Sequence, residues 1–157
     1  MTRRTRAREV ALQVLFQRDH NPALTRADME RFTAERLREE NLQSFCLALV
    51  DGVATHLADI DGKLTAAAEN WRLPRMPTVD RNLLRLGAFE MLIQKETPPA
   101  VVLDEVIELA RRFGTADSPA FVNGVLDRLR RDAAPAPVPA SPPAEQGPEP
   151  VTPDAVE

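Results

Sequence analysis

Apolar residues recur every three or four positions along most of the chain, which is the spacing of one face of an α-helix. The first such stretch, residues 4–18, places on one face Ala7, Val10, Ala11, Val14 and Leu15. A second stretch begins at Thr25 and Asp28, which resemble a variant capping box, and carries Met29, Phe32 and Leu37. No alternating run of strand length occurs. The pattern therefore predicts an all-α domain, packed from antiparallel neighbours with short connections.

A long apolar stripe occupies residues 45–71. Its members are Phe45, Leu49, Val53, Leu57, Ile60, Leu64, Ala68 and Trp71. Glycine weakens a helix interior, so a bend is possible at Gly52 or Gly62. Pro74 and Pro77 end the stripe, because proline lacks the amide hydrogen that a helix interior needs.

Two further helices are predicted between Thr78 and Gly114. Thr78 can cap the first one. Its apolar positions are Val79, Leu83, Leu86, Phe89 and Ile93. Gly87 is a possible point of close helix contact, and Pro98-Pro99 breaks this helix. The second helix runs from about residue 101 to 113, with Gly114 well placed as its C-terminal cap.

The last predicted helix contains an unusual pair of residues. Ser118 and Pro119 look like an N-cap followed by proline at the first helical position. The apolar positions that follow are Phe121, Val122, Val125, Leu126 and Leu129. Asn123-Gly124 lies among them, and glycine there costs about 0.5–1 kcal/mol relative to alanine. Close approach of another backbone or of a ligand explains this cost, and a tightly packed helix crossing explains it equally well.

Charge divides the chain into a neutral body and an acidic tail. The 157 residues carry 20 basic and 24 acidic side chains, and four of the acids lie after Asp132. Residues 1–132 are therefore balanced at 20 of each. Residues 133–157 contain eight prolines and almost nothing large and apolar, so they are predicted to be a disordered tail. A proline-rich recognition segment is the alternative. One domain, residues 1–132, is expected before it.

The sequence offers little catalytic chemistry. Cys46 is the only cysteine and lies in an apolar run, which favours a buried thiol in a reducing cytosol. The only histidines, His20 and His56, lack partners at metal-ligand spacing, and no glycine-rich phosphate loop or nucleophile elbow occurs. No run of 18 to 20 apolar residues is present. We therefore expect a soluble, cytoplasmic protein that is not an enzyme and uses no cofactor or metal.

Basic residues cluster at the N-terminus, where Arg3, Arg4, Arg6 and Arg8 occur with only Glu9 as an acid before Asp19. Four arginines are unfavourable at the positive end of a helix dipole, which prefers carboxylates. An arginine arm can follow a phosphate backbone and stack on unpaired bases. The cluster favours a polyanionic partner, and a solvated arm without a ligand is the alternative.

Three segments together resemble a known family. They are RRTRAREVALQVLFQ, VDRNLLRLGAFEML and VVLDEVIELARRFGTADSPAFVNGVLD, with their spacing. Over residues 3–131 the chain resembles the bacterial NusB family of transcription antitermination factors. The third segment is the most specific, because helical patterning alone does not produce it. The resemblance implies an all-helical fold of about six or seven helices in two small bundles.

The resemblance also implies a function without catalysis. Members of this family pair with the ribosomal protein NusE, bind the boxA element of nascent ribosomal RNA leader transcripts, and join RNA polymerase with other Nus factors. It implies RNA-binding residues at Arg3, Arg4, Arg6, Arg8, Asp117, Ser118 and Phe121, with Thr5 interrupting the arginine run. It implies partner-binding residues at Asp80 and Arg81. Phe121 as a base-stacking ring and Phe121 as a core residue both remain open.

Two other functions are considered. The same helical domain occurs in front of ribosomal RNA cytosine methyltransferases, but such an enzyme needs a further domain with a glycine-rich loop after a strand. Residues 133–157 do not have that composition. The other alternative is a helical protein-interaction module.

Overall fold

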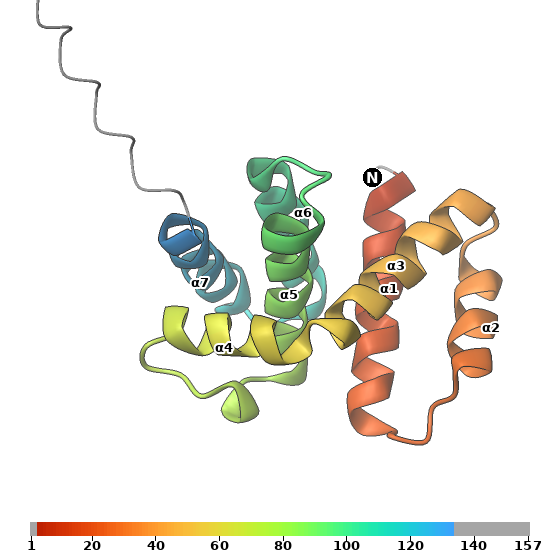
Figure 1. Cartoon of the computed structure of the whole chain (residues 1–157), viewed down its shortest axis with the longest axis horizontal. Helices are drawn as coiled ribbons and strands as arrows, with labels where there is room; N and C mark the ends of the chain where they lie inside the picture. The colour runs from red at the N-terminus through yellow and green to blue at the C-terminus, as the bar shows by residue number, and fades with distance from the viewer. Residues whose placement is uncertain (1–2, 134–157) are drawn as a thin grey trace, which may run out of the picture.

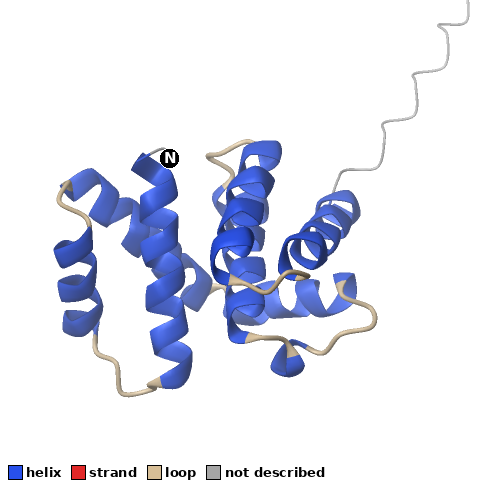
Figure 2. Cartoon of the chain, turned by 180° about the vertical axis from the view of Figure 1, so that it is seen from behind, coloured by secondary structure: helices blue, strands red, loops and turns tan. Residues whose placement is uncertain are grey.

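A computed structural model describes residues 3–133 of the chain (Figure 1). Every regular element in this range is helical (Figure 2). The elements are α1 (Arg3–His20), α2 (Arg26–Arg36), α3 (Glu40–Thr55), α4 (Leu57–Ala67), the 3-10 helix η1 (Leu73–Arg75), α5 (Thr78–Phe89), the π-helix η2 (Glu90–Gln94), α6 (Pro99–Phe113) and α7 (Ser118–Ala133). The all-α prediction is confirmed, whereas the prediction for the tail lies outside the described residues.

The helices form two groups that share a core. Helices α1–α3 lie on one side of the molecule, and α4–α7 lie on the other (Figure 1). Helix α5 contacts α1 and α3 in the first group and α4, α6 and α7 in the second. Its leucines Leu83, Leu84 and Leu86 are fully buried. Burial of apolar surface on several faces of one central helix therefore joins the two groups.

The long apolar stripe breaks at His56, between α3 and α4, and not at either glycine. A Cβ atom at Gly52 would lie 2.0 Å from Cζ of Phe89, so glycine there admits the phenyl ring of a neighbouring helix. A Cβ atom at Gly62 would meet nothing within 4 Å. The stripe also overstates burial at its end, because Trp71 is 55% exposed.

The predicted helix ends are confirmed in part. Thr25 and Asp28 form a complete capping box, in which each side chain bonds the backbone amide of the other residue. Gly114 caps α6, but in an extended and not a left-handed conformation, with φ of −91°. The prediction for Thr78 is wrong, because α5 starts at that residue, Pro77 occupies the cap position, and no side chain caps the helix.

Candidate nucleic-acid interface

The first turns of α1 present three arginines to solvent. Arg3 is exposed, and its Nη1 lies 3.0 Å from Oε2 of Glu39. Arg4 is also exposed, with its guanidinium carbon 4.9 Å from the centre of the Phe45 ring. Arg6 is 41% exposed at its side chain. Exposed ion pairs contribute little to stability, so these side chains can exchange their present contacts for phosphates at low cost.

Arg8 does not belong to this accessible set, which corrects the sequence prediction. Its side chain is 4% exposed. Nε donates to Oε2 of Glu90 at 2.8 Å and Nη2 donates to Oε1 at 2.7 Å. Thr5 is buried as well and donates to Glu105 at 2.6 Å. The positions at 5 and 8 therefore fasten α1 to the second group of helices and present no surface to a ligand.

The accessible arginines continue onto α6 through Glu9. This buried carboxylate pairs with Arg6 at 2.8 Å and with Arg112 at 3.3 Å. The guanidinium of Arg112 also lies 5.1 Å from the centre of the Phe113 ring. We call Arg3, Arg4, Arg6 and Arg112 the basic strip. Sequence reasoning missed Arg112, because a basic residue in the last turn of a helix is already explained by the helix dipole.

A pocket of about 350 Å³ lies where α5 and α7 begin. Its walls are Trp71, Met76, Pro77, Asp80, Thr115, Asp117 and Phe121, and we call it the aromatic pocket. The rings of Trp71 and Phe121 meet edge to face, with centroids 5.6 Å apart. Phe121 is half-buried and packs against the core, so it combines the two alternatives considered from the sequence. Trp71 is the more exposed ring, and the apolar stripe had concealed it.

Two predicted features beside the pocket need correction. Ser118 is 1% exposed, and its hydroxyl oxygen accepts a hydrogen bond from the backbone amide of Thr115 at 2.9 Å. This hydroxyl therefore shapes the loop before α7 and is not presented to a phosphate. Gly124 is exposed, and an added Cβ would meet nothing within 4 Å. A tight helix crossing is thus excluded there, and the glycine lines a shallow depression beside Trp71 and Phe121.

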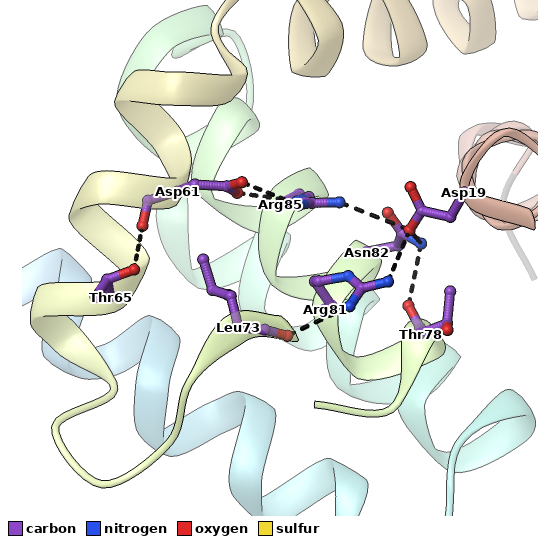
Figure 3. A network of polar contacts seen from close by, with 8 residues as sticks. All are labelled: Asp19, Asp61, Thr65, Leu73, Thr78, Arg81, Asn82 and Arg85. Carbon is purple, nitrogen blue, oxygen red and sulfur yellow. Dashed lines mark hydrogen bonds and ion pairs between the residues drawn. The ribbon is translucent and has the colours of Figure 1, made fainter. Parts of the chain in front are cut away.

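Asp80 and Arg81 occupy different environments despite being adjacent. Asp80 is 5% exposed, and its Oδ1 atom has no hydrogen-bond partner. Arg81 donates to Oδ2 of Asp19 at 3.2 Å and to the carbonyl oxygen of Leu73 at 3.3 Å (Figure 3). Its guanidinium therefore ties the end of α1 to the start of α5 inside the molecule.

The same network extends to α4 and limits what Arg81 can offer a partner. Asn82 donates to Oδ2 of Asp19 at 3.0 Å, and Arg85 donates to both carboxylate oxygens of Asp61 at 2.9 Å (Figure 3). Paired guanidinium–carboxylate contacts of this kind are strong and directional. A protein partner at this surface would meet a preformed network and not a loose arginine.

The structure keeps the two predicted RNA-binding groups apart. The start of α1 lies beside Glu90 at the end of α5, whereas Asp19 near the end of α1 lies beside the first turn of α5. The N-terminus and the connection between α4 and α5 accordingly lie at opposite edges of the molecule (Figure 1). A rise of 1.5 Å per residue separates residues 4 and 19 by about 20 Å. Only an extended ligand can reach both groups.

Other chemistry is sparse in residues 3–133. No group of three His, Cys, Asp or Glu side chains is arranged to hold a metal ion in this range. No helix among these residues is both long and apolar enough to cross a membrane. Burial raises the pKa of the Cys46 thiol to about 11, which confirms the prediction of a buried thiol.

Comparison with known proteins gives consistent matches. The model of the NusB family matches residues 5–131. Transcription antitermination protein NusB of Streptomyces avermitilis is 46% identical over 133 residues, covering 83% of this chain and 92% of that protein. The structure of T. maritima NusB is 35% identical with a TM-score of 0.75, covering 86% of this chain and 94% of the other. A chain in the crystal structure of antitermination factors NusB and NusE in complex with double-stranded RNA is 26% identical with a TM-score of 0.76, covering 84% and 98%.

Proposed function

Because this chain belongs to the NusB family, we propose that it is a transcription antitermination factor that binds, together with the ribosomal protein NusE, the boxA element of nascent ribosomal RNA leader transcripts. Bound to the RNA polymerase elongation complex with other Nus factors, it promotes processive transcription of ribosomal RNA. This role places it in the cytoplasm and requires no catalytic step. The chemistry of the surface consists of binding and positioning.

The observation that carries this proposal is the pairing of the basic strip with the aromatic pocket. Arginine guanidinium groups bind phosphates, and exposed aromatic rings stack unpaired bases for roughly 1–3 kcal/mol each. Duplex RNA buries its bases in the stack, so an aromatic ring is useful mainly against a single strand. A single strand that runs from the start of α1 past Arg112 to Trp71 uses both features.

The residues have distinct roles in this proposal. Arg3, Arg4 and Arg6 contact phosphates, and Phe121 with Trp71 stacks a base. Asp117 stands at the exposed mouth of the pocket, where a carboxylate repels phosphates and accepts hydrogen bonds from base edges. The surface around the start of α5, with Asp80 and Arg81, faces the NusE side.

RNA titration at several salt concentrations tests the arm. Each lost phosphate contact reduces the single-strand salt slope by about 0.7, so replacing Arg4 and Arg6 together by alanine should reduce it by about 1.4. Binding of NusE should survive. Replacement of Arg130 and Arg131, in the last turn of α7, is the matched control and should leave the slope unchanged.

Two results would contradict the proposal. An unchanged salt slope in the Arg4 and Arg6 double variant would remove the arm from the phosphate path. Absence of any shift of boxA RNA in a gel, with NusE present, would instead favour the helical protein-interaction module, whose binding depends on apolar contacts alone.

A further inference from the structure

The aromatic pocket contains a carboxylate that no neighbour satisfies. Asp80 lies in the first turn of α5 and lines the pocket. It is 5% exposed, and its Oδ1 atom makes no hydrogen bond among the described residues. A buried acceptor without a partner is costly. A ligand that brings hydrogen-bond donors into the pocket would remove this cost.

The pocket selects its ligand by donors and by flat apolar surface. An ionised carboxylate only accepts hydrogen bonds, and the terminal torsion of aspartate is broad, so Asp80 can turn toward a ligand. The indole of Trp71 is 55% exposed and offers a face for stacking. Asp117 contributes a second carboxylate at the mouth. Together these groups suit a planar ring that carries N–H groups along one edge.

The charge outside the pocket distinguishes a nucleotide from a basic side chain. Arg72 and Arg75 are exposed neighbours in sequence of the lining residues Trp71 and Met76. Within residues 3–133 neither of these arginines forms an ion pair. Positive charge at the rim repels an incoming lysine or arginine but attracts the phosphates that flank a base. The arrangement of carboxylates inside and guanidinium groups outside therefore favours a nucleotide.

We propose that the aromatic pocket takes one unpaired guanine, stacked on Trp71, whose N1–H and N2 amine donate to the carboxylate of Asp80. Guanine presents two adjacent donors on its Watson–Crick edge, whereas adenine and cytosine present one amine and uracil presents one N–H. A bidentate carboxylate contact is therefore best made with guanine. This inference rests on the proposed RNA binding, and it moves Asp80 from partner contact to base recognition.

Single-strand RNA titration with the full chain and NusE tests the inference. The probe is a short uridine-rich RNA with one central guanosine, and its matched partner carries inosine, which lacks only the N2 amine. We expect the wild-type protein to bind the guanosine RNA roughly tenfold more tightly than the inosine RNA, as a good bidentate base contact provides. An adenosine RNA should be discriminated at least as strongly.

Three variants locate the effect. Asp80→Asn should bring the guanosine-to-inosine ratio close to one, because an amide no longer offers two acceptors. Trp71→Ala should weaken all the RNAs alike, since stacking tolerates every base. Asp104→Asn, at an exposed carboxylate on α6 outside the pocket, is the matched control and should keep the wild-type ratio. Thermal melting confirms that each variant is folded.

The outcomes separate this inference from the proposed function. If the wild-type complex binds no RNA, the proposed function fails and the inference fails with it. If RNA binds but guanosine and inosine bind equally, the inference is overturned while RNA binding stands. If Asp80→Asn weakens NusE binding and leaves the base ratio unchanged, the pocket takes a basic side chain of the protein partner. The wild-type inosine comparison remains decisive even if Asp80→Asn does not fold.

Discussion

Replacing Arg8 by methionine should destabilise the fold strongly, although the sequence places Arg8 beside three accessible arginines. Its guanidinium makes two hydrogen bonds, of 2.8 and 2.7 Å, to the carboxylate of Glu90. Glu90 is 0% exposed, so methionine at position 8 would leave a buried charge without a partner. Loss of one partner of such a pair costs about 3–5 kcal/mol.

That loss should be visible in ordinary unfolding experiments. For a domain of this size it corresponds to a fall in melting temperature of about 10–20 °C, measured by circular dichroism, with urea unfolding as an independent assay. Arg4→Met is the matched control, because Arg4 lies one helical turn earlier on the same face of α1 and is exposed. The control should change the melting temperature little and weaken RNA binding instead.

A compensating variant tests the electrostatic origin of the effect. Replacing a buried ion pair by two apolar residues is often neutral, so Arg8→Met combined with Glu90→Leu should recover most of the lost stability. The reasoning is refuted if Arg8→Met melts like Arg4→Met while lowering the salt slope of RNA binding. That result would return Arg8 to the RNA-binding arm.

Three further outcomes are expected. Phe121→Ala, at a half-buried ring, should cost about 1–3 kcal/mol of stability and about 1–3 kcal/mol of RNA affinity; a larger drop in stability with unchanged RNA affinity would make the ring purely a core residue. Truncation after Asp132 should leave melting temperature and RNA affinity nearly unchanged, because the removed segment lacks apolar periodicity, and a fall of several degrees would show that it docks. Burial holds the pKa of the Cys46 thiol at about 11, above its ordinary value, so alkylation at neutral pH should be slow until the protein unfolds. Because the folded pKa is the higher one, the thiol's contribution to stability should be complete below the unfolded pKa and lost as pH rises toward 11.

Local features of the chain are sufficient to predict most of the helices. The 3.6-residue period reflects contacts within one helix, so it is legible in the sequence before any helix packs. The capping box at Thr25 and Asp28 involves residues only three apart, and it forms as predicted. The all-α fold and the family could therefore be identified from the residues alone.

Burial of individual polar residues was decided by tertiary structure. Arg4 and Arg8 are equivalent in a helical pattern, yet only Arg8 meets Glu90, which is 82 residues away in sequence. Trp71 continues an apolar stripe, yet it follows the last turn of α4 and is exposed beside Phe121. A periodic pattern gives the face of a residue but not the helix that covers that face.

The candidate pocket is likewise a product of packing between distant segments. Trp71 comes from the connection between α4 and α5, Asp80 from the first turn of α5, and Phe121 from the first turn of α7. The sequence by itself determined the helices, their caps and the presence of an arginine-rich start. Only the tertiary structure decided which arginines remain accessible, and it placed an unpartnered carboxylate next to two aromatic rings, because both depend on contacts between residues far apart in the chain.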